Sequence, residues 1–141
     1  MNSALRPPTL RAELLGDADR DVLTRLVHAD PVVNSVVSAR LQATGTLEPR
    51  PFGGSLLGVR DAAGRLAAAA FHGGNLLPLG GAAAELRALA DHVLGGPRLA
   101  TSIVGRASAV ETMWEVLEPV WGPARAVRRR QPLLVNRKSV V

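Results

Sequence analysis

The sequence predicts a mixed α+β domain in which a mostly antiparallel sheet carries helices on both faces. Three observations predict this class. Two short helical segments come first, between residues 17 and 45, and three extended apolar runs separated by glycine-containing turns follow, between 55 and 80. Two helix–strand units come last. The predicted order is α-α-β-β-β-α-β-α-β, with or without one more strand, which differs from the alternation of a doubly wound sheet.

Length and composition predict one domain with a core of small residues. The chain has 141 residues, and we expect a leading segment at 1–16, a single domain at 17–136 and a tail or linker at 137–141. Within the leading segment, residues 10–15 could start a strand or a short helical turn. Hydrophobic residues make up 47% and aromatic residues 3%, so the core must consist mainly of Ala, Leu and Val. The chain has no Cys, which excludes disulfides and thiolate metal sites.

Hydropathy and charge predict a cytoplasmic protein that does not enter membranes. No apolar run approaches the ~18 residues of a membrane span, and residues 1–15 lack the apolar core of a signal peptide. The net charge is +5, and its excess lies in residues 101–141, which carry seven Arg and Lys against three Glu. Because nearly all cations are Arg, a bias typical of GC-rich genomes, the high pI favours genome composition over nucleic-acid binding.

The first half of the chain predicts two short helices in close succession. Asp17 or Asp19 can cap the first helix. Asp30 and Pro31 end it and begin the second, because the residue before proline avoids helical backbone and proline suits a first turn. Gly45 is expected to end the second helix.

A loop at 46–54 then leads into a three-stranded meander. Residues 55–60 and 65–72 read as a hairpin around a D-x-x-G turn, and 75–79 as the third strand. The four consecutive alanines suit a helix by propensity, but the short spacing between glycines favours a strand. Pro78 predicts an irregular position or a strand edge.

The second half predicts two helices and their strands. Residues 82–94 form a helix, and 99–104 a strand apolar enough to be central. Ser108 and Glu111 are expected to form a capping box at the start of the last helix. The remaining strand or strands are expected at 124–127 and 133–135.

Four short sequences point to a known superfamily. They are DPVVNSVVSAR (30–40), GGNLLPLGG (73–81), SIVGRASAVETMWEVLEPVWGPAR (102–125) and RRQPLLV (129–135). Together with the element order, they resemble the amino-terminal half of two-part actinobacterial GNAT N-acetyltransferases, a domain of unknown function that precedes a catalytic GNAT domain. The resemblance implies a GNAT-like fold and an association with acetyl transfer from acetyl-coenzyme A to an amine.

The same resemblance indicates where a coenzyme would bind. The family's motif, [QR]-x-x-G-x-[GA], falls on residues 78–83, where Gly81 and Ala83 match and Gly80 lies beside them. Helix N-termini present free N–H groups to phosphates. Pro78 replaces the Arg or Gln and has no N–H to donate, which weakens the loop. A glycine-rich strand-to-helix turn without a ligand is the favoured explanation of these residues.

Arginines provide further candidate anion sites. Gly105 and Arg106 follow a strand and open a helix, a place where anions dock, and a guanidinium can bind phosphate or carboxylate. A solvated arginine is the alternative. Arg125 and Arg128 belong to an arginine-rich segment that could bind a coenzyme, nucleic acid or an acidic partner, or could simply protect a sheet edge.

Asn34, Trp114 and Trp121 are candidates for acceptor-side or interface contacts. Asn34 lies beside the apolar stripe of the second helix, which borders the acceptor site in GNAT folds; a buried contact to a neighbouring loop is the alternative. The tryptophans share one helix face, which fits core packing or a domain interface. The chain has no Tyr to act as general acid, its meander strands hold no carboxylate, and its histidines lack metal-ligand spacing, so we expect no metal.

These observations leave three functions open. In the first, the chain is a non-catalytic accessory domain of a GNAT N-acetyltransferase that packs against a catalytic domain in cis or a second copy of the chain. Acetyl-coenzyme A is then a cofactor of the complete protein, and this chain need not bind it. In the second, the chain is a small acyltransferase with a weakened coenzyme loop. In the third, it is a basic binding module that uses residues 125–130.

Overall fold

The computed structural model describes residues 10–29 and 34–123 as a mixed α+β fold, which confirms the predicted class. The helices and strands are, in chain order, β1 (Ala12–Leu14), the 3-10 turn η2 (Asp17–Asp19), α1 (Arg20–His28), α2 (Ser35–Thr44), α3 (Pro49–Phe52), β2 (Ser55–Arg60), β3 (Leu66–His72), β4 (Asn75–Gly80), α4 (Ala83–Leu94), β5 (Ser102–Ile103) and α5 (Ala107–Trp121).

The described strands form one mixed sheet in the order β1-β2-β3-β4-β5. Strands β1 to β4 pair with one another in antiparallel order, and β5 runs parallel to β4. The predicted hairpin is confirmed, and its turn is held by the Asp61 carboxylate, which accepts the N–H groups of Ala63 at 2.9 Å and Arg65 at 3.0 Å. The predicted third strand is confirmed as β4.

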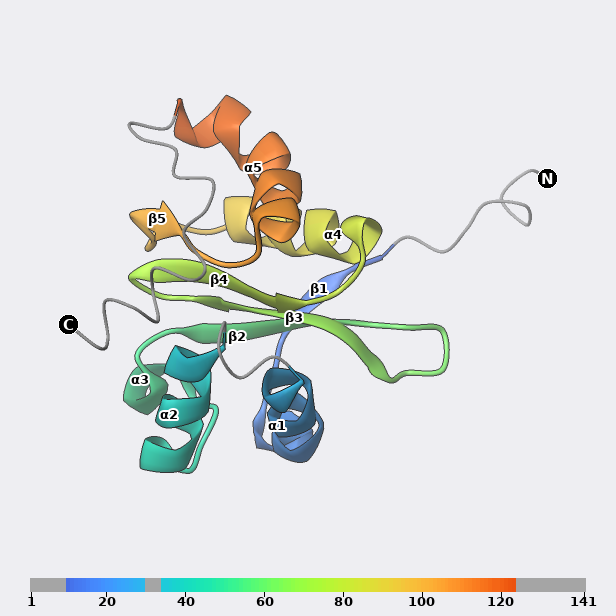
Figure 1. The fold of residues 1–141 in the computed structure, drawn as a ribbon, viewed down its shortest axis with the longest axis vertical. Coiled ribbons are helices and arrows are strands. Elements are labelled where there is room, and N and C mark those ends of the chain that lie inside the picture. The colour runs from blue at the N-terminus through green and yellow to red at the C-terminus, as the bar shows by residue number, and fades with distance from the viewer. Residues whose placement is uncertain (1–9, 30–33, 124–141) are drawn as a thin grey trace.

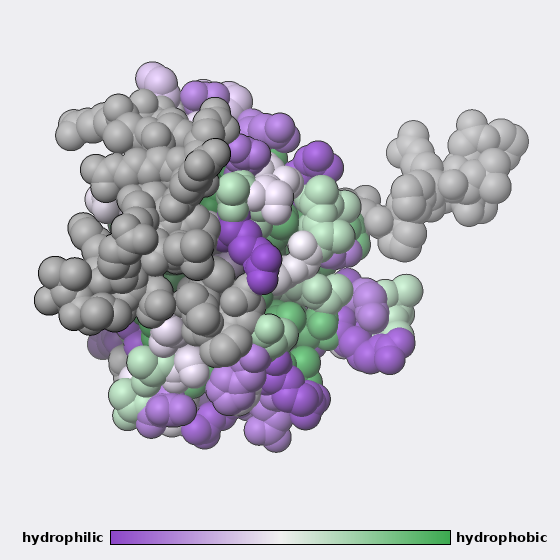
Figure 2. Space-filling model, viewed as in Figure 1, coloured by the Kyte–Doolittle hydropathy of each residue, from purple (hydrophilic) through white to green (hydrophobic). Residues whose placement is uncertain are grey.

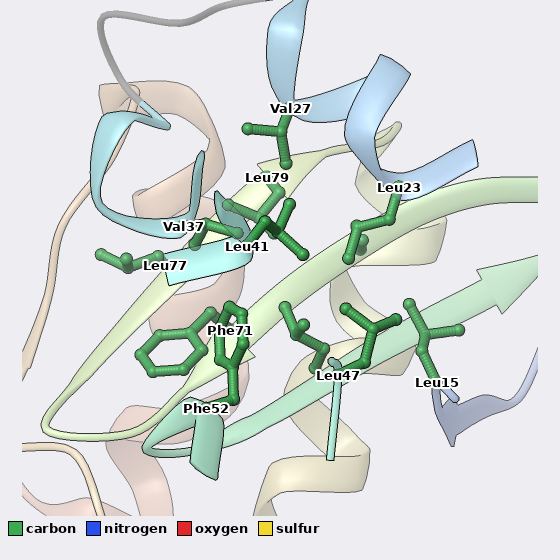
Figure 3. Packing of buried hydrophobic residues seen from close by; sticks show 12 residues of the cluster. Leu15, Leu23, Val27, Val37, Leu41, Leu47, Phe52, Phe71, Leu77 and Leu79 are labelled. Atoms are coloured by element: carbon green, nitrogen blue, oxygen red, sulfur yellow. The ribbon is translucent and has the colours of Figure 1, made fainter. Parts of the chain in front are cut away.

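Helices cover both faces of the sheet, with α4 and α5 on one face and α1, α2 and α3 on the other (Figure 1). Because successive strand residues point to opposite faces, Leu56 belongs to the core under α1–α3 and Leu57 to the core under α4 and α5. Figure 3 shows the first of these cores, where the ring centroids of Phe52 and Phe71 lie 5.6 Å apart.

The alanine run of β3 lies between these two cores. Ala68 and Ala70 face the α4–α5 side and Ala69 faces the other, and all are fully buried. The helix propensity of alanine is overridden because β2 and β4 pair with β3 on its two edges. Small side chains here let the helices of both layers approach the sheet closely.

Asp17 connects the segment before α1 to the loop after α2. Its carboxylate accepts the N–H of Leu47 at 2.6 Å and the hydroxyl of Thr46 at 3.0 Å, and these hydrogen bonds lower the pKa of Asp17. Leu47 is fully buried. The predicted helix cap is therefore absent at Asp17, and Asp19 stands at the N-cap of α1 without a side-chain cap hydrogen bond. Asp19 instead pairs with Arg60 at 2.8 Å.

The structure departs from the prediction at three element boundaries. Residues 12–14, expected in a leading segment, form β1 and pair with β2. Residues 49–52, expected in a loop, form the single-turn helix α3. Helix α5 begins at Ala107, so Ser108 lies inside the first turn and the capping box predicted for it is wrong.

Other predictions fall partly or wholly on residues that the structure does not describe. These include Asp30, Pro31 and the final strands between 124 and 135. The strand predicted at 99–104 is confirmed only over Ser102–Ile103, at the end of the described strand order. None of the helices within 10–29 and 34–123 is long and apolar enough to cross a lipid bilayer.

Truncation of Phe71 tests the core under α1–α3. Phe71→Ala is expected to lower the free energy of unfolding by about 3–5 kcal/mol, because the buried ring would leave a cavity. Val120 is 67% exposed, so Val120→Ala should change stability by no more than about 0.5 kcal/mol. Urea denaturation of both variants checks this, and equal effects would contradict the packing described.

Candidate functional site

The candidate site is a cavity at the point where β5 leaves β4. Pairing between these strands is limited to Asn75 with Ser102 and Leu76 with Ile103. The last backbone hydrogen bond between the two segments runs from the Val104 N–H to the Leu76 oxygen, at 3.0 Å. Helix α4 follows β4 and helix α5 follows β5, so their first turns flank the gap. A cavity of about 460 Å³ lies there.

A β-bulge interrupts β4 in the same region. Ala70 of β3 pairs with Pro78 and Ala69 pairs with Gly80, so Leu79 is an extra residue in β4. The irregular position predicted for Pro78 is therefore confirmed. Because proline has no N–H, it cannot take part as a donor in either ladder.

Gly105 and Arg106 connect β5 to α5 beside this bulge. A Cβ on Gly105 would lie 3.1 Å from Cγ of Pro78, so glycine allows the chain to pass close to the proline ring. Arg106 is the N-cap residue of α5 and lines the cavity. Gly105 contacts Pro78, which itself lines the cavity.

Asn34 connects the α1–α2 layer to the bulge. Its side chain is 2% exposed, and Nδ2 donates long hydrogen bonds to the Val27 oxygen at 3.3 Å and the Leu79 oxygen at 3.5 Å. Asn34 is the N-cap residue of α2, yet it makes no side-chain cap hydrogen bond. Its carboxamide therefore holds the end of α1 against the extra residue of β4 and lines the cavity.

The two glycines between β4 and α4 are required by the backbone and by packing. Gly80 has φ +147° and Gly81 has φ +135°, both of which disfavour a side chain. A Cβ on Gly81 would lie 2.3 Å from Cβ of Ala68, and one on Gly80 would lie 3.3 Å from Cδ1 of Leu26. Their presence is explained without a ligand.

The cavity is lined by apolar side chains and by polar groups from the first turns of helices. Ser108 and Thr112 lie one turn apart on α5, and the Thr112 hydroxyl donates to the Ser108 oxygen at 2.9 Å. Leu26 and Leu86 contribute apolar surface from α1 and α4. Figure 2 shows one face of the molecule, where a strongly hydrophilic patch lies among hydrophobic and intermediate surface near the middle and hydrophilic surface gathers above and below it.

This cavity unites residues that the sequence had placed in three separate candidate sites. Its lining includes the predicted candidates Asn34, Gly80, Gly81, Ala83 and Arg106. Gly105 lies beside it, against the Pro78 ring. The candidates Arg125 and Arg128, with the basic segment that contains them, lie outside the described residues.

The two tryptophans pack elsewhere. Trp114 packs against the core under α4 and α5. The Trp121 ring stacks on His72 with centroids 6.3 Å apart, and the Arg98 guanidinium lies 4.3 Å from the Trp121 centroid. Both contacts are internal packing, and neither tryptophan lines the cavity between β4 and β5.

His72 lies in a second cavity, of about 470 Å³, near the C-terminal end of α4. Its side chain is nearly buried, and Nε2 accepts the Leu99 N–H at 3.3 Å. Burial lowers the pKa of His72, which keeps the ring neutral and able to accept this hydrogen bond. His92 lines the same cavity.

Comparison with known protein families matches residues 54–140 to a family described as a domain of unknown function, DUF4081. The chain belongs to the DUF4081 family. No curated protein and no solved structure matches it. The DUF4081 match contains β2 to β5, α4 and α5, and therefore the walls of the cavity that these elements supply. The wall formed by Leu26, Ala29 and Asn34 precedes the match.

The side chains that line this cavity are of few chemical kinds. Within the described residues, no group of three His, Asp or Glu could hold a metal ion. Of the described residues that line the cavity, Arg106 alone is ionisable. The cavity thus offers hydroxyls, one carboxamide and one guanidinium, which can hold a ligand but do not form an acid–base pair.

Sequence reasoning missed part of the site. Leu26 and Ala29 line the cavity but carried no sequence signal for a site. Thr112 follows Ser108 by one helical turn, a spacing that places both on one face and could have identified it.

Substitution of Gly81 tests the close contact between β3 and the start of α4. Gly81→Ala is expected to destabilise the fold by about 2–4 kcal/mol, through backbone strain and overlap with Ala68. Ala68→Gly in the same chain should restore part of the loss. Gly74→Ala, where the added Cβ meets open space, is the matched control. Thermal denaturation that ranks Gly74→Ala as the more damaging change would contradict the contact.

The burial of His72 predicts a pH dependence of stability. Its pKa is lower in the folded chain than the ordinary value of 6.5, so its contribution is complete above pH 6.5 and is lost as the pH falls toward the folded-state pKa. Urea denaturation between pH 7.5 and about 5 measures this loss. The slope of the free energy of unfolding against pH should be smaller in His72→Gln, whose amide oxygen can still accept the Leu99 N–H. An unchanged slope would exclude His72 as its source.

Proposed function

We propose that this domain is a non-catalytic, GNAT-like accessory domain of an N-acetyltransferase, which packs against a catalytic domain and helps to shape the acceptor site. The cavity between β4 and β5 is the observation that carries the proposal. Gly81 and Ala83, singled out by resemblance, and Arg106, singled out by its place before a helix, all line that cavity.

The order of elements supports the same proposal. After β1, two helices, a three-stranded meander, a helix, a strand and a further helix follow one another, apart from the single turns of η2 and α3. This is the order that the resemblance to GNAT proteins implies. The position of α1 and α2 beside the cavity suits a role toward an acceptor, because Leu26, Ala29 and Asn34 form one of its walls.

The lining of the cavity argues against catalysis by this domain. Attack of an amine on an acetyl group requires a base that removes the amine proton. Hydroxyls, a carboxamide and a guanidinium, the polar side chains of the described lining, do not serve as such a base at neutral pH. We therefore assign acyl transfer to the partner domain.

The start of α4 does not fit the pyrophosphate of acetyl-coenzyme A. Pro78 has no N–H to donate, and the Ala82 N–H already donates to Glu85 Oε1 at 2.7 Å. The glycines of this loop are accounted for by packing. In this proposal the coenzyme is held by the complete protein through its catalytic domain, and the stand-alone acyltransferase has less support.

In this proposal the partner is a catalytic GNAT domain in the same polypeptide. The alternative partner is a second copy of this chain. A cytoplasmic location goes with this role in our proposal, and the lack of Cys in this sequence suits a reducing compartment. The exposed hydrophobic side chains of the described residues include Leu99 and Val120, at 52% and 67% exposure. Single side chains of this kind are normal on surfaces and do not identify the docking face.

The test uses the natural polypeptide that contains this sequence. We expect this polypeptide to contain a second GNAT domain with the [QR]-x-x-G-x-[GA] motif. We also expect it to release coenzyme A from acetyl-coenzyme A in the presence of amines. This chain alone is expected to release none. In the complete protein, Thr112→Val should raise KM for the amine by about threefold or more, with KM for acetyl-coenzyme A within about twofold of wild type.

Thr24→Val is the matched control for this substitution. The Thr24 hydroxyl donates to the backbone oxygen of Arg20, one turn earlier, as the Thr112 hydroxyl does to that of Ser108. Thr24 does not line the cavity. Release of coenzyme A by this chain alone, or equal effects of the two substitutions, would refute the proposal.

A further inference from the structure

We propose that Glu85 is a built-in anion that occupies the N-terminus of α4 and thereby excludes polyphosphate ligands, coenzyme A among them, from the cavity between β4 and β5. The role is that of a specificity-determining residue. It deepens the proposed function, on which it rests for the choice of coenzyme A as the relevant ligand. The exclusion itself concerns any ligand that presents linked phosphates to this helix.

The geometry places a carboxylate where a phosphate would have to bind. The first hydrogen bond within α4 runs from the Leu86 N–H to the Ala82 oxygen at 2.9 Å, so the earlier N–H groups of the helix have no acceptor within it. The N–H that begins this turn, at Ala82, donates to Glu85 Oε1 at 2.7 Å. The Glu85 side chain therefore folds back over the end of the helix.

The electrostatic consequence follows from the size of the charges. A helix N-terminus carries the equivalent of roughly half a positive charge. One full carboxylate charge more than offsets it, so the combined potential no longer attracts a second anion. The Glu85 carboxylate belongs to the same chain, three residues from the Ala82 N–H, so its local concentration there is high. An external phosphate must displace this carboxylate before it can accept the Ala82 N–H.

The position of Glu85 connects this end of the helix to the cavity. A Cβ on Gly81 would lie 3.7 Å from Cβ of Glu85, and Gly81 lines the cavity. Glu85 itself stands just outside the lining. A ligand that reached the α4 N-terminus through the cavity would pass Gly81 and Ala83 and meet the carboxylate there.

The neighbouring strand offers nothing that would offset this repulsion. Pro78, which lines the cavity immediately before the glycines, lacks the N–H that any other residue would contribute. A side chain at Gly81 would overlap with Ala68, so this position has no side chain to offer a ligand. On the α4 side of the described cavity, the carboxylate of Glu85 therefore opposes the attraction that the helix N–H groups exert on a polyanion.

The experiment titrates the full chain with inorganic pyrophosphate and, separately, with coenzyme A, while backbone amide signals are followed by NMR. Wild type is expected to show no saturable shifts up to about 10 mM of either ligand. Glu85→Ala frees the Ala82 N–H and removes the charge, and should bind pyrophosphate at least about tenfold more tightly. The shifts should be centred on residues 81–84.

Two further variants separate charge from hydrogen bonding and from folding. Glu85→Gln keeps an oxygen acceptor for the Ala82 N–H but removes the charge, so its affinity should lie between wild type and Glu85→Ala. It also retains the helix cap, which keeps the test valid if Glu85→Ala unfolds. Asp91→Asn removes the same charge near the other end of α4 and should leave pyrophosphate binding undetectable.

Three results would overturn the role of Glu85: saturable binding to wild type, absence of binding to both Glu85 variants, or an equal gain in Asp91→Asn. These results differ from those that would refute the accessory role, which depends on coenzyme A release by this chain alone and on the amine KM of the complete protein. Binding of coenzyme A to wild type without turnover would remove the Glu85 inference and leave the accessory role standing.

Discussion

Pro78 stands in β4, a strand with neighbours on both sides, and has no N–H to give to either of them. An interior strand accepts proline only where the ladder is interrupted. The pairing of β4 is interrupted on both of its edges. The ladder to β3 has a bulge at Leu79, and the pairing with β5 ends at Leu76. The gap that results is the cavity, and α4 and α5, which begin directly after the two strands, supply its polar edge.

The elements around the cavity determine its shape, and the side chains that line it determine what it can bind. Two cores on opposite faces keep the sheet in place, and Asn34 fixes the bulge to the α1–α2 layer. The cavity that they support contains groups able to hold a ligand, while the end of α4 is already occupied by the carboxylate of Glu85. These groups are the basis on which we propose an accessory role beside a catalytic partner.

Much of the fold could be predicted because its signals are local. The Asp61–Gly64 turn and the α4 helix follow from turn chemistry and apolar periodicity. β1 could not be distinguished from a helical turn, since three residues carry no usable period and pair with a strand far along the chain. The site shows the same division. Gly81 and Arg106 stand out locally, but Asn34 reaches Leu79 across 45 positions. Glu85 closes a helix whose N-cap residue is Ala82, so no S-x-x-E pattern marks it.

The parting of β4 and β5 is tested most directly by NOE contacts between them in the isotopically labelled chain. Backbone contacts are expected between Leu76 and Ile103, followed by a contact from the Gly105 α-protons to the Pro78 ring, and by none from β5 to Gly80. Backbone contacts that continue in register from β5 to the end of β4 would show a closed sheet. A closed sheet would remove the cavity, and with it the basis for the function proposed.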